Sequence, residues 1–351
     1  MGIRPANKME ENKRTEIGDL GEFGLIERIQ SKITNTNRST VKGIGDDAAV
    51  IDCGDRYQLV STDMLIEGIH FDLSYMPLQH LGYKAVSVNV SDIAAMNGTP
   101  EQITVSLGLS NRISVEAIDA LYEGIKFACK DYNVDLVGGD TTASQTGLII
   151  SITAIGTVDK DKVVYRNTAK DKDIICVTGD IGGAYIGLQA LEREKQVFQA
   201  NPDMQPELGD FEYAIQRQLK PVARMDIIHE LKELKIVPTS MIDVSDGLVS
   251  DLFHICKSSD VGAAIFEDKL PLSNEAMASA VELNIDPITA AMNGGEDYEL
   301  LFTIAQSDHD KIKNHSDISE IGYVNAKDKA KNLITKNEQA IALQAQGWKH
   351  F

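Results

Sequence analysis

The sequence predicts a mixed α+β protein, α/β in part, with two domains. Its 351 residues are enough for two domains of ordinary size. Short β-prone segments alternate with helical patterns along most of the chain. Several β-prone segments run into aspartates, hydroxyl side chains or glycine pairs. We expect a mobile tail over 1–17, an N-terminal domain over 18–160 and a C-terminal α/β domain over 161–351.

The composition is that of a globular protein, with 43% hydrophobic and 25% charged residues. The formal charge of −19 argues against nonspecific binding to nucleic acid or to anionic membranes. The four cysteines are scattered and form no Cys-x-x-Cys pair, so we expect free thiols in a reducing compartment. No stretch of 18 apolar residues and no signal-peptide core is present, which favours a cytoplasmic protein without a membrane partner.

The first part of the chain predicts a short helix within 20–33 and a hairpin whose first strand spans 49–52. Before the hairpin, two glycines precede Asp46 and Asp47, so the backbone can bend and bring both carboxylates to one place. The second strand is expected to end at Ser61-Thr62-Asp63. Three oxygen-bearing side chains there suit Mg²⁺. In both places a simple polar turn is the alternative.

A helix over 79–97 is apolar nearly all round and is therefore expected to be buried. It contains Lys84, Asn89 and Asp92, and a buried aspartate needs a partner or a metal ion. A structural pair between Asp92 and Lys84 is one alternative. The two residues are eight positions apart, about two turns, so we favour metal for Asp92.

A strand over 103–109 and a helix over 114–132, capped by Ser114, are expected next. A short strand over 134–137 then leads into Gly138-Gly139-Asp140-Thr141-Thr142. We expect a turn here, whose free N–H groups can hold phosphate oxygens. A strand over 148–158 closes the first domain.

The second domain follows a connector containing Arg166, which is either a phosphate clamp or an ordinary surface arginine. A strand over 174–178 leads through Gly182-Gly183 into a helix ending near Leu191, an arrangement that often binds anions. No Gly-Lys-Ser/Thr sequence occurs, which excludes P-loop enzymes. The stretch 192–209 is expected to be a surface loop.

The remaining elements are a helical stretch over 211–234 broken at Pro221, a strand over 241–243, a helix over 248–257 and a strand over 263–266. The strand at 241–243 leads to two further carboxylates, Asp243 and Asp246. Near the end, a glycine pair and Glu296 precede an apolar strand. The sole tryptophan, Trp348, is either a core anchor or a stacking platform.

Aspartates thus recur at strand ends and glycine turns, and together they would repel one another unless divalent cations neutralised them. Such a site suits phosphoryl transfer, in which catalysis is mostly positioning and electrostatic stabilisation. Spacing alone therefore predicts Mg²⁺-dependent phosphate chemistry.

Seven motifs, taken in order, resemble the thiamine-monophosphate kinase family of the aminoimidazole-ribonucleotide synthetase-like superfamily. The resemblance runs from about residue 21 to the C-terminus. The motifs are Gly-Glu-Phe-x-Leu-Ile (21–26), Gly-Ile-Gly-Asp-Asp-Ala-Ala (43–49), Ser-Thr-Asp-Met-Leu-Ile-Glu-Gly-Ile-His-Phe (61–71), Lys-Ala-x5-Ser-Asp-Ile-Ala-Ala-Met (84–96), Gly-Gly-Asp-Thr-Thr (138–142), Asp-Val-Ser-Asp-Gly-Leu (243–248) and Gly-Gly-Glu-Asp-Tyr-Glu-Leu (294–300). Asn97 departs from the glycine usual in this family, and 192–209 matches none of its motifs.

The resemblance implies the superfamily's two-domain fold, with an N-terminal domain that binds ATP and Mg²⁺ and pairs through strands in a homodimer. It implies that the C-terminal domain completes the nucleotide and substrate sites. The implied reaction is ATP-dependent phosphorylation of thiamine monophosphate to thiamine diphosphate, the last step in making that cofactor, by direct in-line transfer with several Mg²⁺ ions.

The resemblance also assigns site residues by position. Those resembling the magnesium ligands are Asp47, Ser61, Thr62, Asp63, Asp92, Asp140, Asp243 and Asp246. Those resembling nucleotide contacts are Tyr122, Gly139, Asp140, Arg166 and Ser245, and those resembling thiamine-phosphate contacts are His70, Glu296 and Trp348. Asp63, Asp92 and Asp140 would act electrostatically through the metal. No general base is assigned, because the accepting phosphate is already ionised near neutral pH.

Two rival functions remain. One is another ATP-using enzyme of the superfamily, of the aminoimidazole ribonucleotide synthetase or selenophosphate synthetase type. The absence of cysteine from residues 1–50 counts against a selenophosphate synthetase. The other is a non-catalytic nucleotide- or metal-binding relative, and the complete acidic set argues against it.

Overall fold

The computed structural model describes residues 15–326 and 329–345. The described residues fall into two compact units, and the boundary between them in the chain lies between Asn35 and Thr36. The first unit contains a short 3₁₀ turn (Ile17–Asp19) and helix α1 (Gly21–Gln30). Helix α1 confirms the helix predicted within 20–33 and ends three residues before the predicted limit. The other elements belong to the second unit.

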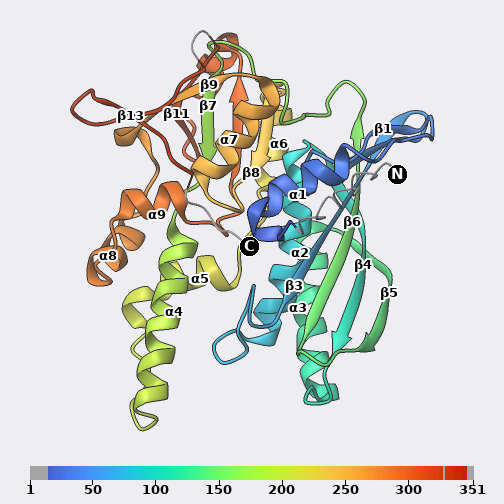
Figure 1. Ribbon diagram of the computed structural model, residues 1–351, viewed down its shortest axis with the longest axis vertical. Coiled ribbons are helices and arrows are strands. Elements are labelled where there is room, and N and C mark those ends of the chain that lie inside the picture. Colours follow the sequence, from blue (N-terminus) through green and yellow to red (C-terminus); the bar gives the residue numbers. More distant parts are fainter. Residues whose placement is uncertain (1–14, 327–328, 346–351) are drawn as a thin grey trace, which may run out of the picture. The chain divides into compact units, whose positions relative to one another are not determined.

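The first sheet of the larger unit has six strands in the order β1-β2-β3-β6-β4-β5 (Figure 1). Its centre is the antiparallel pair of β3 and β6, which stay in register from Arg56 opposite Asp159 to Ile66 opposite Ile149. The pair of strands at one edge of the sheet, β4 and β5, is parallel. The strands are β1 (Thr40–Lys42), β2 (Ala49–Asp52), β3 (Arg56–Ile66), β4 (Thr99–Leu109), β5 (Asp135–Ala143) and β6 (Ile149–Asp159).

Two expectations about strand ends were wrong. Ser61-Thr62-Asp63 lies inside β3, not at its end, because the backbone ladder with β6 continues through these residues. Gly138 to Ala143 form the second half of β5, not a turn, because they pair with β4. Polar side chains are compatible with a strand in both places, because those on β5 are exposed and the inward-facing Ser61 is hydrogen-bonded to Asp92.

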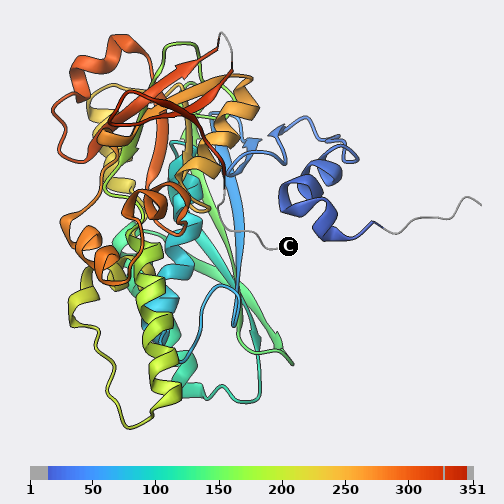
Figure 2. The ribbon, with the colours of Figure 1, turned by 60° about the vertical axis from the view of Figure 1, so that its left-hand side comes forward.

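Helix α2 (Leu78–Ala95) is the central helix of the larger unit. Fourteen of its eighteen residues are buried, as its apolar sequence predicts. It packs on strands β3, β4 and β6 and on α3 (Val115–Tyr132), and it also contacts β8, α5 and α6 from the second half of the chain (Figure 2). In α3, the Ser114 hydroxyl accepts a hydrogen bond from Ala117 N, which confirms the predicted cap.

The second sheet has seven strands in the order β13-β12-β9-β11-β7-β10-β8. Its strands are β7 (Ile174–Thr178), β8 (Ser240–Asp243), β9 (Gly262–Phe266), β10 (Leu300–Ile304), β11 (Ile318–Asn325), β12 (Lys331–Ile334) and β13 (Ala340–Ala342). The accompanying helices are α4 (Gly183–Ala200), α5 (Glu212–Leu219), α6 (Met225–Glu233), α7 (Leu248–Ser259), α8 (Asn274–Glu282), α9 (Pro287–Asn293) and α10 (His309–Ile312).

Helix α4 is longer than predicted. It continues through 192–200, so the loop predicted over 192–209 begins only after Ala200. The polar side chains of this extension have partners: Lys195 Nζ lies 3.3 Å from Glu192 one turn earlier and 2.7 Å from Asp72. These ion pairs let a polar sequence remain helical.

Two large hydrophobic clusters form the core. One joins the first sheet and α2 to residues of α6, β8 and β10, so the two sheets share one buried interior. The other lies between the second sheet and α7. In the described part of the chain, no helix combines the length and the hydrophobicity needed to span a membrane.

Candidate active site

The carboxylates of Asp47, Asp92 and Asp243 meet at one place, and we call them the acid cluster. One oxygen from each lies within 4.8 Å of the others. Asp47 comes from the turn between β1 and β2, Asp92 from the last turn of α2, and Asp243 from the end of β8. The fold therefore brings together three of the predicted metal ligands from widely separated segments.

The acid cluster is withdrawn from water. Asp243 is 4% exposed, and the side chain of Asp47 is 3% exposed. Burial raises the pKa of Asp243 to about 8, and the nearby charge of Asp47 adds to this rise. Burial also raises the pKa of Asp92 well above its usual range, with further contributions from Asp63 and Asp243. Without a bound cation, the negative charges of these carboxylates are poorly neutralised by the protein.

Hydroxyl side chains hold the cluster in place. Ser61 Oγ donates a hydrogen bond to Asp92 Oδ2, and Ser91 Oγ donates one of 2.6 Å to Asp243 Oδ2. Asp47 Oδ2 is buried and accepts no hydrogen bond from the described residues. An all-oxygen group with a buried free carboxylate oxygen fits a hard divalent cation such as Mg²⁺.

Asp63 lies beside the cluster on the inner face of β3. Its backbone N donates a 3.0 Å hydrogen bond to Asn89 Oδ1 of α2, which fixes the strand against the helix. Burial raises the pKa of Asp63 to about 6, and the charges of Glu296 and Asp47 act in the same direction. The structure therefore places Asp63 in the same electrostatic environment as the acid cluster.

Arg166 is the cation at the edge of the cluster. Its Nη2 lies 2.6 Å from Asp47 Oδ1, and its Nε lies 3.5 Å from Asp46 Oδ1. Its side chain is 18% exposed, so it is not an ordinary solvated arginine. Burial and Asp47 raise the pKa of Asp46 to about 6, and Arg166 opposes that rise. Lys42 Nζ also lies 3.5 Å from Asp46 Oδ2, so Asp46 has a second cation, whereas Arg166 is the cation next to Asp47 of the acid cluster.

Two loops from the second half of the chain are joined next to the cluster. The Ser245 carbonyl accepts a 2.8 Å hydrogen bond from Glu296 N. Asp251 Oδ2 accepts hydrogen bonds of 3.2 Å from both Asp246 N and Gly247 N, which holds the turn after β8. Sequence reasoning missed Asp251, although an aspartate in an apolar helix was a usable signal.

Glu296 forms an ion pair with the buried Lys84. Lys84 Nζ also donates to the Gln218 carbonyl at 3.1 Å, and the Lys84 side chain is fully buried. Tyr298 Oη donates a 3.1 Å hydrogen bond to the other Glu296 oxygen. The alternative of an Asp92–Lys84 pair was therefore wrong, because Lys84 pairs across to the loop before β10.

Thr62 and Asp140 are not brought to the acid cluster. Thr62 alternates with Ser61 and Asp63, so its side chain faces the other side of the sheet, where Thr62 Oγ1 donates to the Ile152 carbonyl at 3.0 Å. Asp140 is exposed on β5 and, through the strand register, shares the face of exposed Met64. No described helix of the larger unit covers this face (Figure 2).

The remaining predicted residues lie elsewhere in the fold. Tyr122 is half-buried on α3 and packs against the core. Gly139 lies on β5, where a Cβ would come within 1.8 Å of the Val105 carbonyl, so only glycine fits. His70 lies after β3, and its Nδ1 accepts a 3.0 Å hydrogen bond from Ile66 N. Trp348 lies outside the described residues.

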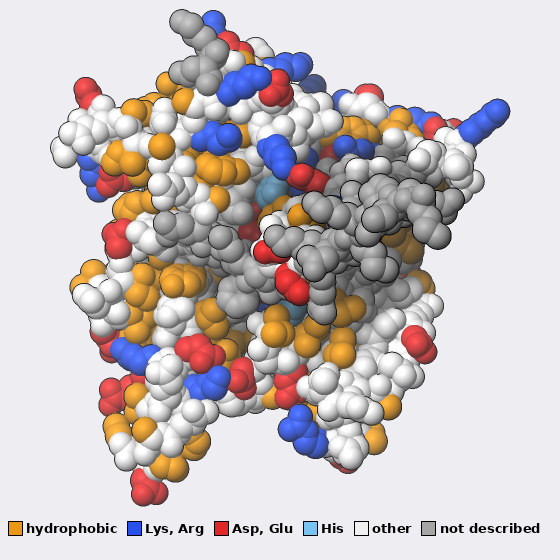
Figure 3. All heavy atoms as spheres, in the orientation of Figure 1, with side chains coloured by type: hydrophobic (Ala, Val, Ile, Leu, Met, Phe, Trp, Pro, Cys, Tyr) orange, Lys and Arg blue, Asp and Glu red, His pale blue; other side chains and the backbone are white. Residues whose placement is uncertain are grey.

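Charges of both signs are interspersed with hydrophobic side chains on the face of the molecule seen in Figure 3. This view shows no continuous basic surface of the kind that nucleic acid requires.

Family models match two parts of the chain: the AIR synthase related protein N-terminal domain over 45–158 and the corresponding C-terminal domain over 171–332. The thiamine-monophosphate kinase of Bacillus subtilis is 35% identical over 338 residues, covering 95% of this chain and all of the relative. The thiamine-monophosphate kinase of Aquifex aeolicus is also 35% identical, covering 95% of this chain and 99% of the relative.

Solved structures agree with these relatives. AaThiL complexed with AMPPCP and TMP superimposes with a TM-score of 0.81 at 33% identity, covering 97% of this chain and all of that one. Thiamine-monophosphate kinase from Stenotrophomonas maltophilia superimposes with a TM-score of 0.70 at 32% identity, covering 91% and 98%. A HypE–HypF complex, at 21% identity and a TM-score of 0.65 over 92% and 99%, shares the fold.

Proposed function

The chain belongs to the thiamine-monophosphate kinase family, and we propose that it transfers the γ-phosphoryl group of ATP to thiamine monophosphate, giving ADP and thiamine diphosphate. The observation that carries this proposal is the acid cluster, with its attached hydroxyls, buried between α2 and the two sheets. Phosphoryl transfer needs little covalent chemistry from a protein and much electrostatic positioning, which this arrangement suits.

Magnesium ions are part of the proposal. Asp47, Asp92 and Asp243 would hold them, with Asp63 and Ser61 close by, and Asp246 is assigned as a further ligand by family position. When bound, the ions would neutralise the carboxylates and the phosphate oxygens of both substrates. The free, buried Asp47 Oδ2 supports this assignment, because a buried carboxylate oxygen without a donor is costly unless a cation occupies its neighbourhood.

The protein's own side chains do the positioning. Ser61 and Ser91 fix Asp92 and Asp243, and Asn89 fixes the backbone at Asp63. Asp63 and Asp92 act electrostatically, and no side chain is needed as a general base, since a phosphate oxygen of the acceptor is ionised near neutral pH.

The substrate contacts remain assignments by family position. On the nucleotide side they are Arg166 and Ser245, together with Tyr122, Gly139 and Asp140. On the thiamine-phosphate side they are His70, Glu296 and Trp348. Arg166 already carries the favourable charge for a phosphate, and exchanging one of its two carboxylate partners for a phosphate oxygen would keep it paired.

A homodimer is the proposed working form. Strand β5 is exposed along its full length and presents Leu136 and Val137, which are 40% and 58% exposed, and neighbouring Met64 is 51% exposed. An apolar edge of this kind is normally covered. Thr62 and Asp140 lie on the same open face as Met64, and in the proposed dimer a second copy would bring further ligand groups to that face. We place the reaction in the cytoplasm.

One assay tests the function directly. Purified protein is incubated with Mg·ATP and thiamine monophosphate, and thiamine diphosphate is measured by chromatography. Formation of thiamine diphosphate that is stoichiometric with ADP is expected. The absence of this product, together with turnover of aminoimidazole ribonucleotide precursors or selenide, would assign the chain to another activity of the superfamily. ATP binding without turnover of any acceptor would indicate a non-catalytic relative.

A further inference from the structure

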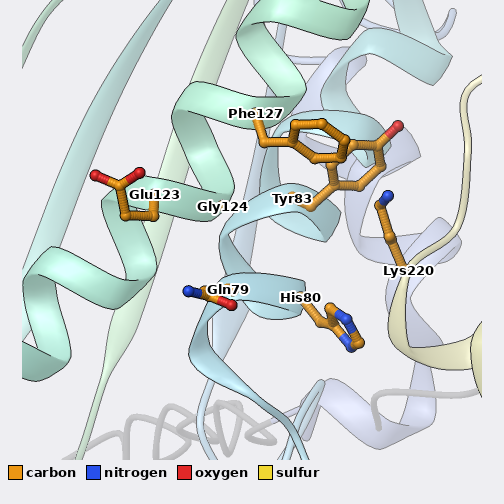
Figure 4. A pocket seen from close by; sticks show the side chains of 7 residues that line it. All are labelled: Gln79, His80, Tyr83, Glu123, Gly124, Phe127 and Lys220. Carbon is orange, nitrogen blue, oxygen red and sulfur yellow. The ribbon is translucent and has the colours of Figure 1, made fainter.

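A pocket lies at the opposite end of α2 from the acid cluster. It has a volume of about 350 Å³ and is lined by residues of α2, residues of α3 and Lys220, which follows α5 (Figure 4). Tyr83 on its wall precedes Asp92 by nine residues, which is about 14 Å along the helix axis. The pocket is therefore separate from the acid cluster.

The pocket presents a cation without an acidic partner. Lys220 Nζ lies 4.2 Å from the centre of the Tyr83 ring and 4.5 Å from that of Phe127. In the described part of the chain, Lys220 forms no ion pair with a carboxylate. Glu123 also lines the pocket, but it pairs with Lys126 at 2.8 Å and points away from Lys220 in Figure 4.

His80 adds an unsatisfied polar atom to the same wall. Its Nδ1 is buried and has no hydrogen-bond partner among the described residues. Burial and the charge of Lys220 lower the pKa of His80, so its imidazole is neutral at pH 7 and can donate one hydrogen bond to a ligand. A buried polar nitrogen without a partner is uncommon, and a bound ligand or an ordered water is one explanation for it.

Two aromatic rings form another part of the wall. The Tyr83 and Phe127 rings lie 5.7 Å apart at 43°, and Phe127 is 49% exposed, so part of its ring is open to the pocket side. Beneath them α2 and α3 are in close contact, since a Cβ on Gly124 would come within 1.9 Å of the Gln79 carbonyl. Close helix packing makes this wall rigid and preformed, as ligand sites usually are.

We propose that this pocket binds a small organic anion, with its phosphate or carboxylate group on Lys220 and His80 and its ring or apolar body against the half-exposed Phe127, behind which Tyr83 is 3% exposed. The volume is at the lower end of the range for small-molecule sites, roughly 300–1,000 Å³, which limits the ligand to a small metabolite. The ammonium supplies the charge recognition, and the Phe127 ring supplies contact area.

Binding of two aromatic anions tests the proposal without relying on turnover. Phenyl phosphate and benzoate are titrated into the full-length protein by calorimetry and saturation-transfer NMR, with Mg²⁺, an unhydrolysable ATP analogue and thiamine monophosphate present to occupy the proposed active site. Saturable binding with Kd in about the millimolar range is expected for at least one of them, as suits such small ligands. The stronger binder identifies the head group, and benzyl alcohol serves as the neutral control.

Variants locate the binding. Lys220→Met is expected to weaken binding by about 10-fold or more, because a charged hydrogen bond is lost. Phe127→Ala, at a half-exposed position that tolerates substitution, is expected to weaken it several-fold. Lys130→Met, on an exposed part of α3, is the matched control and leaves binding unchanged. Unaltered binding in Lys220→Met and Phe127→Ala, equal binding of benzyl alcohol, or no saturable binding of either anion would overturn the proposal, whatever the outcome of the kinase assay.

Discussion

At the scale of single residues, the alternation of side chains along β3 decides which oxygen ligands can act together. Ser61 and Asp63 face α2 and the acid cluster, whereas Thr62 between them faces the opposite side of the sheet. Ser61-Thr62-Asp63, which resembles a single group of ligands in the sequence, therefore presents its side chains on two opposite faces of the sheet.

Replacing Asp63 with asparagine separates its electrostatic role from a structural one. The variant Asp63→Asn is expected to lower kcat by about 10²-fold or more, because a preorganised charge at the reacting phosphates is lost. Its metal-free stability at pH 8 should be unchanged or higher by up to about 2 kcal/mol, because the pKa of Asp63 is raised to about 6 and ionisation there opposes folding.

The control for this experiment is Asp55→Asn in the exposed turn before β3, which should leave both kcat and stability unchanged. Steady-state kinetics and thermal unfolding supply the measurements. A kcat close to that of the parent protein in Asp63→Asn would remove Asp63 from the metal site.

The aspartates of the acid cluster were predictable from the sequence, but the residues that contact them were not. An aspartate in an all-apolar helix requires a partner, which identified Asp92. Residue types alone did not show that Ser91 would hold Asp243, 152 positions away, or that Lys84 would pair with Glu296. Contacts between distant segments depend on the fold, and neither spacing nor local propensity encodes them.

At the scale of elements, strands and helices were predicted well where hydrophobic periodicity was strong. Polar stretches were misread: β5 carries Gly138-Gly139-Asp140 within its ladder, and α4 extends over a polar sequence stabilised by ion pairs. Composition favoured turns and loops there, and tertiary hydrogen bonds and charge pairs outweighed it.

The α2–α3 contact depends on glycines that a helix would otherwise avoid. A Cβ at Gly124 would come within 1.9 Å of the Gln79 carbonyl, and one at Gly82 within 2.1 Å of the Leu121 carbonyl. Gly124→Ala is therefore expected to destabilise the protein by about 2–3 kcal/mol, although alanine favours an isolated helix by about 1 kcal/mol.

Chemical denaturation measures this effect. Gly24→Ala in α1 is the control, because its Cβ would meet only the Leu20 side chain at 3.4 Å, and no loss of stability is expected there. A neutral or stabilising Gly124→Ala would mean that the two helices can move apart without cost.

The Lys84–Glu296 pair joins α2 to the loop before β10, and its two halves should differ in energetic importance. Lys84 is fully buried, whereas the Glu296 side chain is 29% exposed. Glu296→Ala leaves a buried ammonium with only the Gln218 carbonyl and should cost about 3 kcal/mol. Lys84→Met leaves a partly hydrated carboxylate and should cost less, about 1–2 kcal/mol.

The double variant Lys84→Met/Glu296→Ala should be more stable than the sum of the two losses implies, because neither charge is left alone. Urea unfolding of the four proteins gives the coupling energy. Additive losses would show that the two side chains do not stabilise each other.

At the scale of the whole molecule, the surplus of negative charge and the buried carboxylates act in the same direction. The chain carries a formal charge of −19, and burial raises the pKa of Asp63 to about 6, that of Asp297 to about 7 and that of Asp243 to about 8. The folded protein without metal therefore holds protons that the unfolded chain, with carboxyl pKa values near 4, has released.

Stability of the metal-free protein should consequently fall as pH rises from 5.5 to 8. The folded state binds more protons than the unfolded state across this window, so the unfolding free energy decreases with pH, at up to about 1.4 kcal/mol per pH unit for each such group. We expect Tm to drop by several degrees between these pH values after treatment with EDTA. Repeating the measurement at high KCl separates the contribution of the buried carboxylates to this drop in Tm from that of the surface charges, which salt screens.

Mg²⁺ should reverse this loss, and more strongly at pH 8 than at pH 5.5, because the ion binds the ionised carboxylates and competes with protons. In Asp243→Asn the increase in Tm caused by Mg²⁺ should largely disappear, whereas in Asp55→Asn it should persist. An increase of the same size at both pH values, or one that survives in Asp243→Asn, would place the stabilising ion outside the acid cluster. The acid cluster would then owe its arrangement to protons shared among its carboxylates, and the proposed magnesium site would have to be abandoned.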